Sequence, residues 1–240
     1  MAPPRAALIA LSLLLPGPLT AQETKPPAQP SEEVIGAWKK AGLAFGWYGQ
    51  GREGTADFQG NAKGLTGALP AFRPTNRQLA KLPKLPDPKV PFALDLRRTR
   101  ITDKGLKDLA ALPSLAALDL GLTPVTGDGL KELKGLKNLT ALSLWGAEVS
   151  DAGVKGVAEL KGLTRLVLSM TKISDAGLKE LAELKGLTAL SLSHNEVTDK
   201  GLKEIAGLKK LTSLALLYTR VTDDGVEELK KALPKCKVTR

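Results

Sequence analysis

The chain has 240 residues, of which 42% are hydrophobic and 25% are charged, and its formal net charge at pH 7 is +10. This composition excludes a disordered or fibrous protein and is typical of a globular one. Aromatic residues make up only 4%, whereas leucine recurs at fixed intervals, which indicates many small stacked layers rather than one compact core.

The first 21 residues have the features of a secretory signal peptide. One basic residue, Arg5, precedes an apolar run from Ala6 to Leu15, and Ala21 offers a small-residue cleavage point. The run is about 10 residues long, too short for the ~20 that a membrane-spanning helix needs. We therefore expect residues 1–21 to be removed and the mature chain to be secreted or periplasmic, with no membrane span and one positive charge fewer.

Residues 22–30 are rich in proline and predict an extended linker. An N-terminal capping region is expected at residues 31–90. Ser31 is placed to begin a helix that runs to Ala41, with acidic residues in its first turn and a glycine after its end. Its apolar face is predicted to comprise Val34, Ile35 and Trp38.

Two strands are expected next, at residues 43–48 and 55–59, and residues 60–90 are expected to form irregular turns that cover the first layer of the repeats. The loop at residues 49–54 spells GxGxxG. In a dinucleotide-binding fold this motif lies between a strand and a helix, and a kinase-type loop would need HRD and DFG motifs that the chain lacks. We interpret it as a hairpin turn.

A 24-residue repeat occupies residues 91–234 six times without insertion or deletion. The repeats start at Pro91, Leu115, Leu139, Leu163, Leu187 and Leu211. Positions 4 and 6 of each repeat are leucine, and position 11 is β-branched. Because neighbouring residues of a strand face opposite sides, a spacing of two predicts a strand that buries one face.

The second half of each repeat predicts a short helix. Position 12 is Ser or Thr and position 13 is usually Asp, which supply side-chain oxygens for the exposed amides of a helix start. Position 15 is always glycine, and we expect it to allow a close approach of helix and sheet. Residues 235–240 are expected to form a C-terminal cap, in which the single cysteine, Cys236, is either buried or available for an intermolecular bridge.

Residues 91–240 resemble leucine-rich repeats. The pattern LxxLxLxxTxV(T/S)DxGLxxL is close to the cysteine-containing subclass found in F-box substrate receptors and in related bacterial repeat proteins of the exported type. The resemblance implies an α/β solenoid, with a curved parallel sheet on the concave side and short helices on the convex side. Position 9, where the family carries Asn or Cys, is usually Thr here, and we expect its hydroxyl to replace part of the usual hydrogen-bond ladder.

Positions 3, 5, 7 and 8 of each repeat are expected to face outward on the concave side. Large apolar and aromatic groups at positions that the core does not require are typical interface anchors. The candidate partner-binding residues are Arg97, Arg98, Leu122, Trp145, Arg165, Met170, His194, Leu217 and Tyr218. The alternative is that loops or the caps fold over some of them.

Nothing in the sequence indicates a catalytic residue, a metal site or a cofactor. With one histidine and one cysteine, the parts for a metal centre or a Ser-His triad are lacking. Asp95 and Asp119 are predicted to lie one strand apart, about 5 Å, as in retaining glycosidases, but neighbouring arginines neutralise them. Lysines on the outer helices alternate with acids, which argues against nucleic acid.

These observations favour an exported binding module for a protein or peptide partner. One alternative is adhesion to an anionic cell-envelope polysaccharide through the basic surface. A second is a substrate-recognition subunit of a ubiquitin ligase, which needs an F-box; the residues before the repeats are too rich in glycine and proline for that helical module. A third is glycosidase-like hydrolysis at Asp95 and Asp119.

Overall fold

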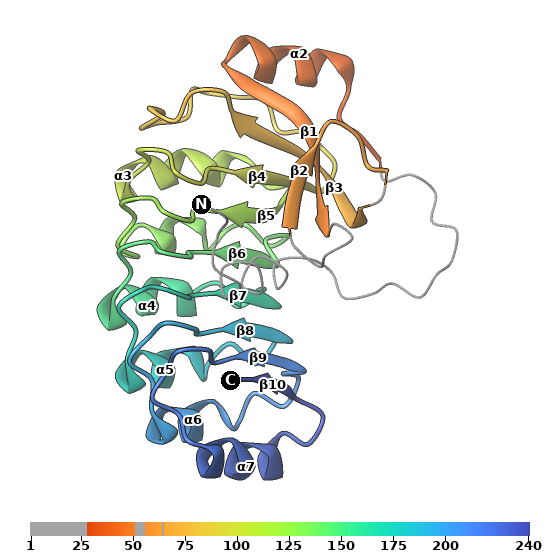
Figure 1. Cartoon of the computed structure of the whole chain (residues 1–240). Coiled ribbons are helices and arrows are strands. Elements are labelled where there is room, and N and C mark those ends of the chain that lie inside the picture. The colour runs from red at the N-terminus through yellow and green to blue at the C-terminus, as the bar shows by residue number, and fades with distance from the viewer. Residues whose placement is uncertain (1–27, 51–55, 64) are drawn as a thin grey trace.

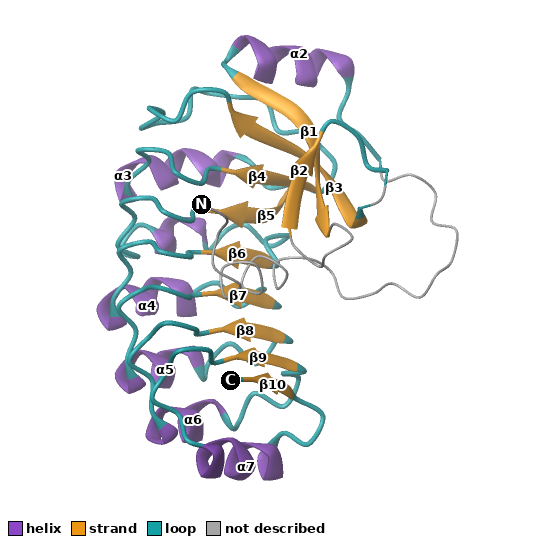
Figure 2. Cartoon of the chain, viewed as in Figure 1, coloured by secondary structure: helices purple, strands orange, loops and turns teal. Residues whose placement is uncertain are grey.

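The structure, a computed structural model, describes residues 28–50, 56–63 and 65–240. In this part of the chain one sheet of ten strands runs the length of the molecule, in the order β10-β9-β8-β7-β6-β5-β4-β3-β1-β2. Helices and 3-10 turns line one side of its parallel part (Figures 1 and 2), which confirms the predicted α/β solenoid. None of the helices described is long and apolar enough to cross a bilayer.

The cap comprises α2 (Glu32–Lys40), β1 (Leu43–Gln50), β2 (Ala56–Gln59) and β3 (Thr66–Pro74). The parallel strands are β4 (Phe92–Asp95), β5 (Leu115–Asp119), β6 (Ala141–Ser143), β7 (Arg165–Val167), β8 (Ala189–Ser191), β9 (Ser213–Ala215) and β10 (Lys237–Thr239). The elements on the convex side are α3 (Asp103–Leu106), η1 (Lys107–Ala111), η2 (Leu130–Leu133), α4 (Asp151–Ala158), α5 (Asp175–Leu181), α6 (Asp199–Ile205) and α7 (Asp223–Ala232).

Helix α2 begins and ends as the sequence predicts. The Ser31 Oγ accepts a hydrogen bond from the Val34 amide at 3.3 Å, and Gly42 adopts a left-handed φ of 83° that turns the chain into β1. Trp38 is fully buried and stacks on Phe72 at 4.1 Å between ring centroids. The helix therefore closes the end of the solenoid core.

The third strand of the cap is a correction to the predicted irregular turns at residues 60–90. β3 pairs antiparallel with β1 and parallel with β4, with Phe72 opposite Leu94. The predicted hairpin is confirmed by the antiparallel pairing of β1 with β2, although residues 51–55 of its loop lie outside the described residues, as do the predicted signal peptide and most of the linker. Because β3 joins both ladders, the cap continues the sheet of the repeats.

The leucines stack in register through the repeats. Leu118, Leu142, Leu166, Leu190 and Leu214 are consecutive cross-strand partners, and none of them is more than 1% exposed. The position-9 hydroxyls donate to the position-6 carbonyl of the same repeat, as expected, for example from Thr99 to Leu96 at 2.7 Å. These contacts hold each strand against the turn that follows it.

The position-13 aspartates form what we call the carboxylate ladder. Asp175 accepts hydrogen bonds from the Thr198 amide at 2.8 Å and from the Thr198 hydroxyl at 2.7 Å, so its side chain reaches into the next repeat. The same pairs of bonds join Asp103 to Thr126, Asp151 to Ser174, and Asp199 to Thr222. The aspartates therefore tie consecutive repeats together besides standing in their own helix starts.

The ladder explains the invariant glycine at position 15, for which close packing of helix and sheet was expected. A Cβ on Gly201 would lie 2.3 Å from the Asp175 Oδ1. Gly177 and Gly225 face the carboxylate of the preceding repeat in the same way. In these three repeats the glycine makes room for the carboxylate of the neighbouring aspartate, whereas a Cβ on Gly105 would meet the Ile101 side chain and a Cβ on Gly153 would meet the Thr126 carbonyl oxygen.

The second repeat departs from the predicted helix. Gly127 stands where the other repeats have aspartate, and its φ of 110° brings the chain so close to the third repeat that a Cβ would lie 2.6 Å from the Gly153 Cα. In this repeat the 3-10 turn η2 stands where the later repeats have an α-helix. The step from repeat 2 to repeat 3 is packed by backbone contact instead of a carboxylate.

The C-terminal end adds one strand beyond the six predicted. β10 pairs in parallel with β9, and the Arg240 guanidinium donates to the Asp223 carboxylate. Cys236 is buried, as one of the two expectations had it, and burial raises the pKa of its thiol to about 11.

We expect Gly201→Ala to lower the free energy of unfolding by about 2 kcal/mol, because the new methyl group displaces the Asp175 carboxylate and breaks its bonds to Thr198. Gly135→Ala is the control, since nothing lies within 4 Å of its Cβ position. Urea unfolding of both variants measures the difference. Equal stability of the two would contradict a steric role for the glycine.

Candidate functional site

The concave floor, which we define as positions 3 and 5 of the repeats, is built mainly from small side chains. Position 3 is alanine in repeats 1, 2, 3 and 5. The first three of these alanines are consecutive cross-strand neighbours, and Arg165 at position 3 of repeat 4 lies between Ala141 and Ala189. The alanines form a second hydrophobic cluster with Val167, Ala215 and the cap residue Tyr48. The serines of position 5, Ser143 and Ser191, are also buried.

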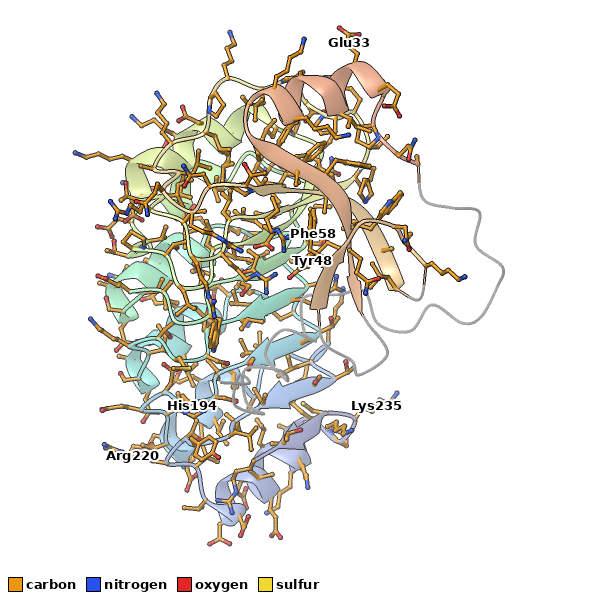
Figure 3. The ribbon with its side chains drawn as sticks, turned by 45° about the horizontal axis from the view of Figure 1, so that its top comes forward. Glu33, Tyr48, Phe58, His194, Arg220 and Lys235 are labelled. Carbon is orange, nitrogen blue, oxygen red and sulfur yellow. The ribbon has the colours of Figure 1, made fainter. Side chains whose placement is uncertain are left out.

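A buried polar cluster occupies the first two strands of the floor. The Arg97 guanidinium donates to Asp95 at 2.8 and 2.9 Å and lies 3.2 Å from the Asp119 carboxylate. The Tyr48 hydroxyl donates to the same oxygen, Asp119 Oδ2, at 3.2 Å. Figure 3 places Tyr48 where the cap strands meet the first strands of the repeats, so this cluster joins β1 to β4 and β5.

Burial dominates the protonation of this cluster. It raises the pKa of Asp119 to about 6, although the Arg97 charge opposes the rise. It also raises the pKa of Tyr48 well above its ordinary value, helped by the Asp119 charge. Burial alone would lower the pKa of Arg97, but the charges of Asp119 and Asp95 outweigh it and the pKa is raised. The Arg97 guanidinium is therefore paired with the carboxylates of both Asp95 and Asp119.

The geometry of Asp95 and Asp119 does not favour glycoside hydrolysis. The two residues are cross-strand partners, as predicted, but both are at most 2% exposed. The gap between Tyr48, Ala93 and Asp119 leaves no volume for a water molecule. A retaining glycosidase has to admit a sugar between its carboxyl groups, so the cluster is suited to holding the cap on the repeats.

Position 8 follows each strand and has an unusual backbone. Every repeat adopts a left-handed φ there, between 56° and 63°. The residues are Arg98, Leu122, Gly146, Met170, His194 and Tyr218. This conformation costs an L-amino acid about 1 to 2 kcal/mol and is free for glycine. We call this row the position-8 ridge.

The ridge carries the most exposed large apolar side chains of the described residues. Tyr218 is 74% exposed, Met170 43% and Leu122 37%. His194 stacks on Tyr218 with 4.4 Å between ring centroids, and Figure 3 shows it on the same side of the lower repeats as Arg220. The single glycine of the ridge, Gly146, has its Cβ position taken by the Leu122 side chain, 2.7 Å away.

The remaining predicted residues divide between the ridge, the floor and the polar cluster. Trp145 and Leu217 at position 7 are half-buried, and Trp145 packs against the alanines of the floor. Arg98 is exposed, whereas Arg97 is compensated within the polar cluster. Arg165 is half-buried on the floor, and burial lowers the pKa of its guanidinium to about 10.

Sequence reasoning placed these side chains on the concave side but missed the left-handed backbone and the role of Tyr48. The ridge has a faint signal, because glycine occurs once in its column. The Tyr48 contact has none, since 71 residues separate it from Asp119. No described residues form a cluster of three metal-ligating side chains.

Comparison with known proteins identifies the repeats. Residues 93–110, 163–182 and 187–206 match the model of a family described as Leucine Rich repeat, so the chain carries leucine-rich repeats. No curated protein sequence matches the chain.

Similar solved structures are leucine-rich-repeat proteins of bacteria. An internalin (inlF) from Listeria monocytogenes has 28% identity and a TM-score of 0.50, covering 61% of this chain, which spans only 39% of the internalin. Internalin C2 from the same species has 23% identity and a TM-score of 0.59, covering 90% of this chain and 89% of its own. A Leptospira interrogans leucine-rich-repeat protein has 26% identity and a TM-score of 0.51, covering 71% and 48%.

We expect Asp119→Asn to change how stability depends on pH. A carboxyl group whose folded pKa is about 6 stabilises the folded state below its unfolded pKa of about 4 and loses that contribution as pH rises through 6. The free energy of unfolding of the natural chain should therefore fall relative to the variant by about 2 to 3 kcal/mol between pH 4 and pH 7. Thermal unfolding across this range measures it, and a constant difference would show that Arg97 keeps Asp119 ionised throughout.

Proposed function

We propose that this chain is an exported, non-catalytic binding module that holds a protein or peptide partner on the position-8 ridge and the adjoining concave floor. The repeats would be of the 24-residue, cysteine-containing-like kind. The binding residues would be Arg98, Leu122, Trp145, Arg165, Met170, His194, Leu217 and Tyr218. Arg97 is left out because its charge is already compensated by Asp95 and Asp119.

The observation that carries the proposal is the retention of large side chains at left-handed positions. Leu122, Met170 and Tyr218 have the backbone that favours glycine, and all three are exposed, Tyr218 the most. They therefore cost stability without filling the core, and strain of this kind collects at functional sites. Exposed aromatic and methionine side chains are favoured interface anchors.

Export rests on the sequence of residues 1–21, whose charge and apolar length are typical of a signal peptide. A ubiquitin-ligase subunit is disfavoured further by the described cap, which holds one helix and three strands where an F-box would be helical. Adhesion to an anionic polysaccharide is favoured only by the net charge of +10. The lysines of the convex side have acids beside them, as in the ion pairs Lys161–Glu183 and Lys231–Glu228.

We expect Met170→Gly to raise the free energy of unfolding by about 0.5 to 1 kcal/mol relative to Met170→Ala. Glycine relieves the left-handed strain, whereas alanine keeps the Cβ; the greater freedom of glycine in the unfolded chain offsets part of the gain. Chemical unfolding of both variants measures the difference. A glycine variant less stable than the alanine variant would show that the Met170 position is not strained.

Partner capture should depend on the same residues. We expect the chain lacking residues 1–21 to retain a protein from an extracellular or periplasmic extract, and Met170→Gly and Tyr218→Gly each to weaken retention at least tenfold. Lys203→Gln, an exposed change on α6, is the control and should retain as much as the natural chain. Retention should persist in about 1 M salt, where the Debye length is ~3 Å; loss in salt, with equal retention by the glycine variants, would favour the polysaccharide instead.

A further inference from the structure

One charge stands alone on the concave side of repeats 3 to 6. In these four repeats, positions 3, 5, 7 and 8 carry alanine, serine, apolar or aromatic residues, one glycine, one histidine, and a single arginine, Arg165, with no lysine or acidic residue. Its cross-strand neighbours at position 3 are Ala141 and Ala189. The methyl groups of these alanines offer the guanidinium no hydrogen-bond partner from either neighbouring strand.

The guanidinium lacks a compensating acid among the described residues. The Arg165 Nε is buried and donates no hydrogen bond, and none of the ion pairs in the described part of the chain includes this residue. Burial is the one cause that lowers the pKa of Arg165. Arg97, three repeats earlier, is the contrast, because two aspartates surround it.

We propose that Arg165 binds a carboxylate of the protein partner, so that the concave side of repeats 3 to 6 recognises an acidic side chain set among apolar contacts. This inference rests on the proposed function and names the chemistry of its partner. A partly dehydrated guanidinium with open donors forms strong charge-assisted hydrogen bonds with a carboxylate. The charge that is costly in the free protein would be neutralised in the complex.

The surroundings favour a single carboxylate over a polyanion. One positive charge matches one negative charge, whereas an anionic polymer is held by a row of cations, and positions 3, 5, 7 and 8 of repeats 3 to 6 offer no second one. Position 7 of repeat 4 is Ser169, four residues after Arg165. At 3.3 Å per residue along a strand, it lies on the order of 13 Å from Arg165. Ser169, Met170 and the stacked His194 and Tyr218 lie at that end, ready for an apolar group of the same partner.

A displayed library of linear 12-residue peptides provides the probe. We expect peptides selected on the natural chain to be enriched in Asp or Glu at one position, together with an apolar or aromatic residue. The selected peptides should bind Arg165→Gln at least tenfold more weakly, and Arg165→Lys should restore part of the affinity. Arg100→Gln removes an exposed positive charge outside positions 3, 5, 7 and 8 and should bind as the natural chain does.

The outcomes separate this inference from the proposed function. Peptides that lose affinity with Tyr218→Gly but not with Arg165→Gln would overturn the carboxylate site and leave the binding module intact. A library that yields no selected peptide would overturn the module itself. Binding of polygalacturonate that depends on Arg165, without selected peptides, would replace the protein partner by an acidic polysaccharide.

Stability gives an independent readout. Arg165→Met keeps the length of the side chain and removes the uncompensated charge, so we expect the melting temperature to rise by about 2 to 4 °C. A melting temperature that falls by several degrees would show that Arg165 has a structural partner, which would overturn the proposal.

Discussion

The structure depends on the contact between the position-13 carboxylate of one repeat and the position-15 glycine of the next. The Asp175 carboxylate can bind the amide and hydroxyl of Thr198 only because Gly201 has no Cβ to occupy its place. The same pair of residues joins repeats 3 to 4, 4 to 5 and 5 to 6, where Gly177, Gly201 and Gly225 each face the carboxylate of the preceding repeat. At these steps the carboxylate and the glycine hold neighbouring repeats at the same spacing, whereas repeats 2 and 3 meet through their backbones at Gly127 and Gly153.

The leucine columns could be predicted because they depend on a repeated local pattern. A strand that buries position 4 and position 6 is encoded within one repeat, and neighbouring copies fix its pairing, as Leu142 and Leu166 illustrate. The glycine column was predicted as a position but not explained. Its partner lies in a different repeat, so no window within one repeat contains both residues. The missing aspartate at Gly127 was visible in the sequence, but the close approach of Gly127 to Gly153 and the 3-10 turn that follows were not.

The cap and the candidate site could be predicted only in part, for two physical reasons. Strand β3 does not belong to the repeats, so no recurring pattern in the sequence predicts it. Its pairing with β4 brings together residues that a loop separates, such as Phe72 and Leu94. The fate of Arg97 was equally hidden, because one neighbour, Tyr48, arrives from the cap. Arg97 and Arg165 look alike in the sequence. Their surroundings differ, because Arg97 is paired with two aspartates whereas the cross-strand neighbours of Arg165 are two alanines.

The two ends of the concave side differ in how their charges are compensated. At the first two strands, the charges of the floor are paired within the protein and Tyr48 contacts them, so only the ridge residues Arg98 and Leu122 are proposed to contact a partner at this end. From the third repeat on, the floor is small and uncharged except for Arg165, and Met170 and Tyr218 of the ridge remain exposed on a strained backbone. A solenoid selected for stability alone would carry glycine along the ridge and a neutral residue on the floor. The large ridge residues and the uncompensated Arg165 support the proposal that a partner binds the C-terminal repeats.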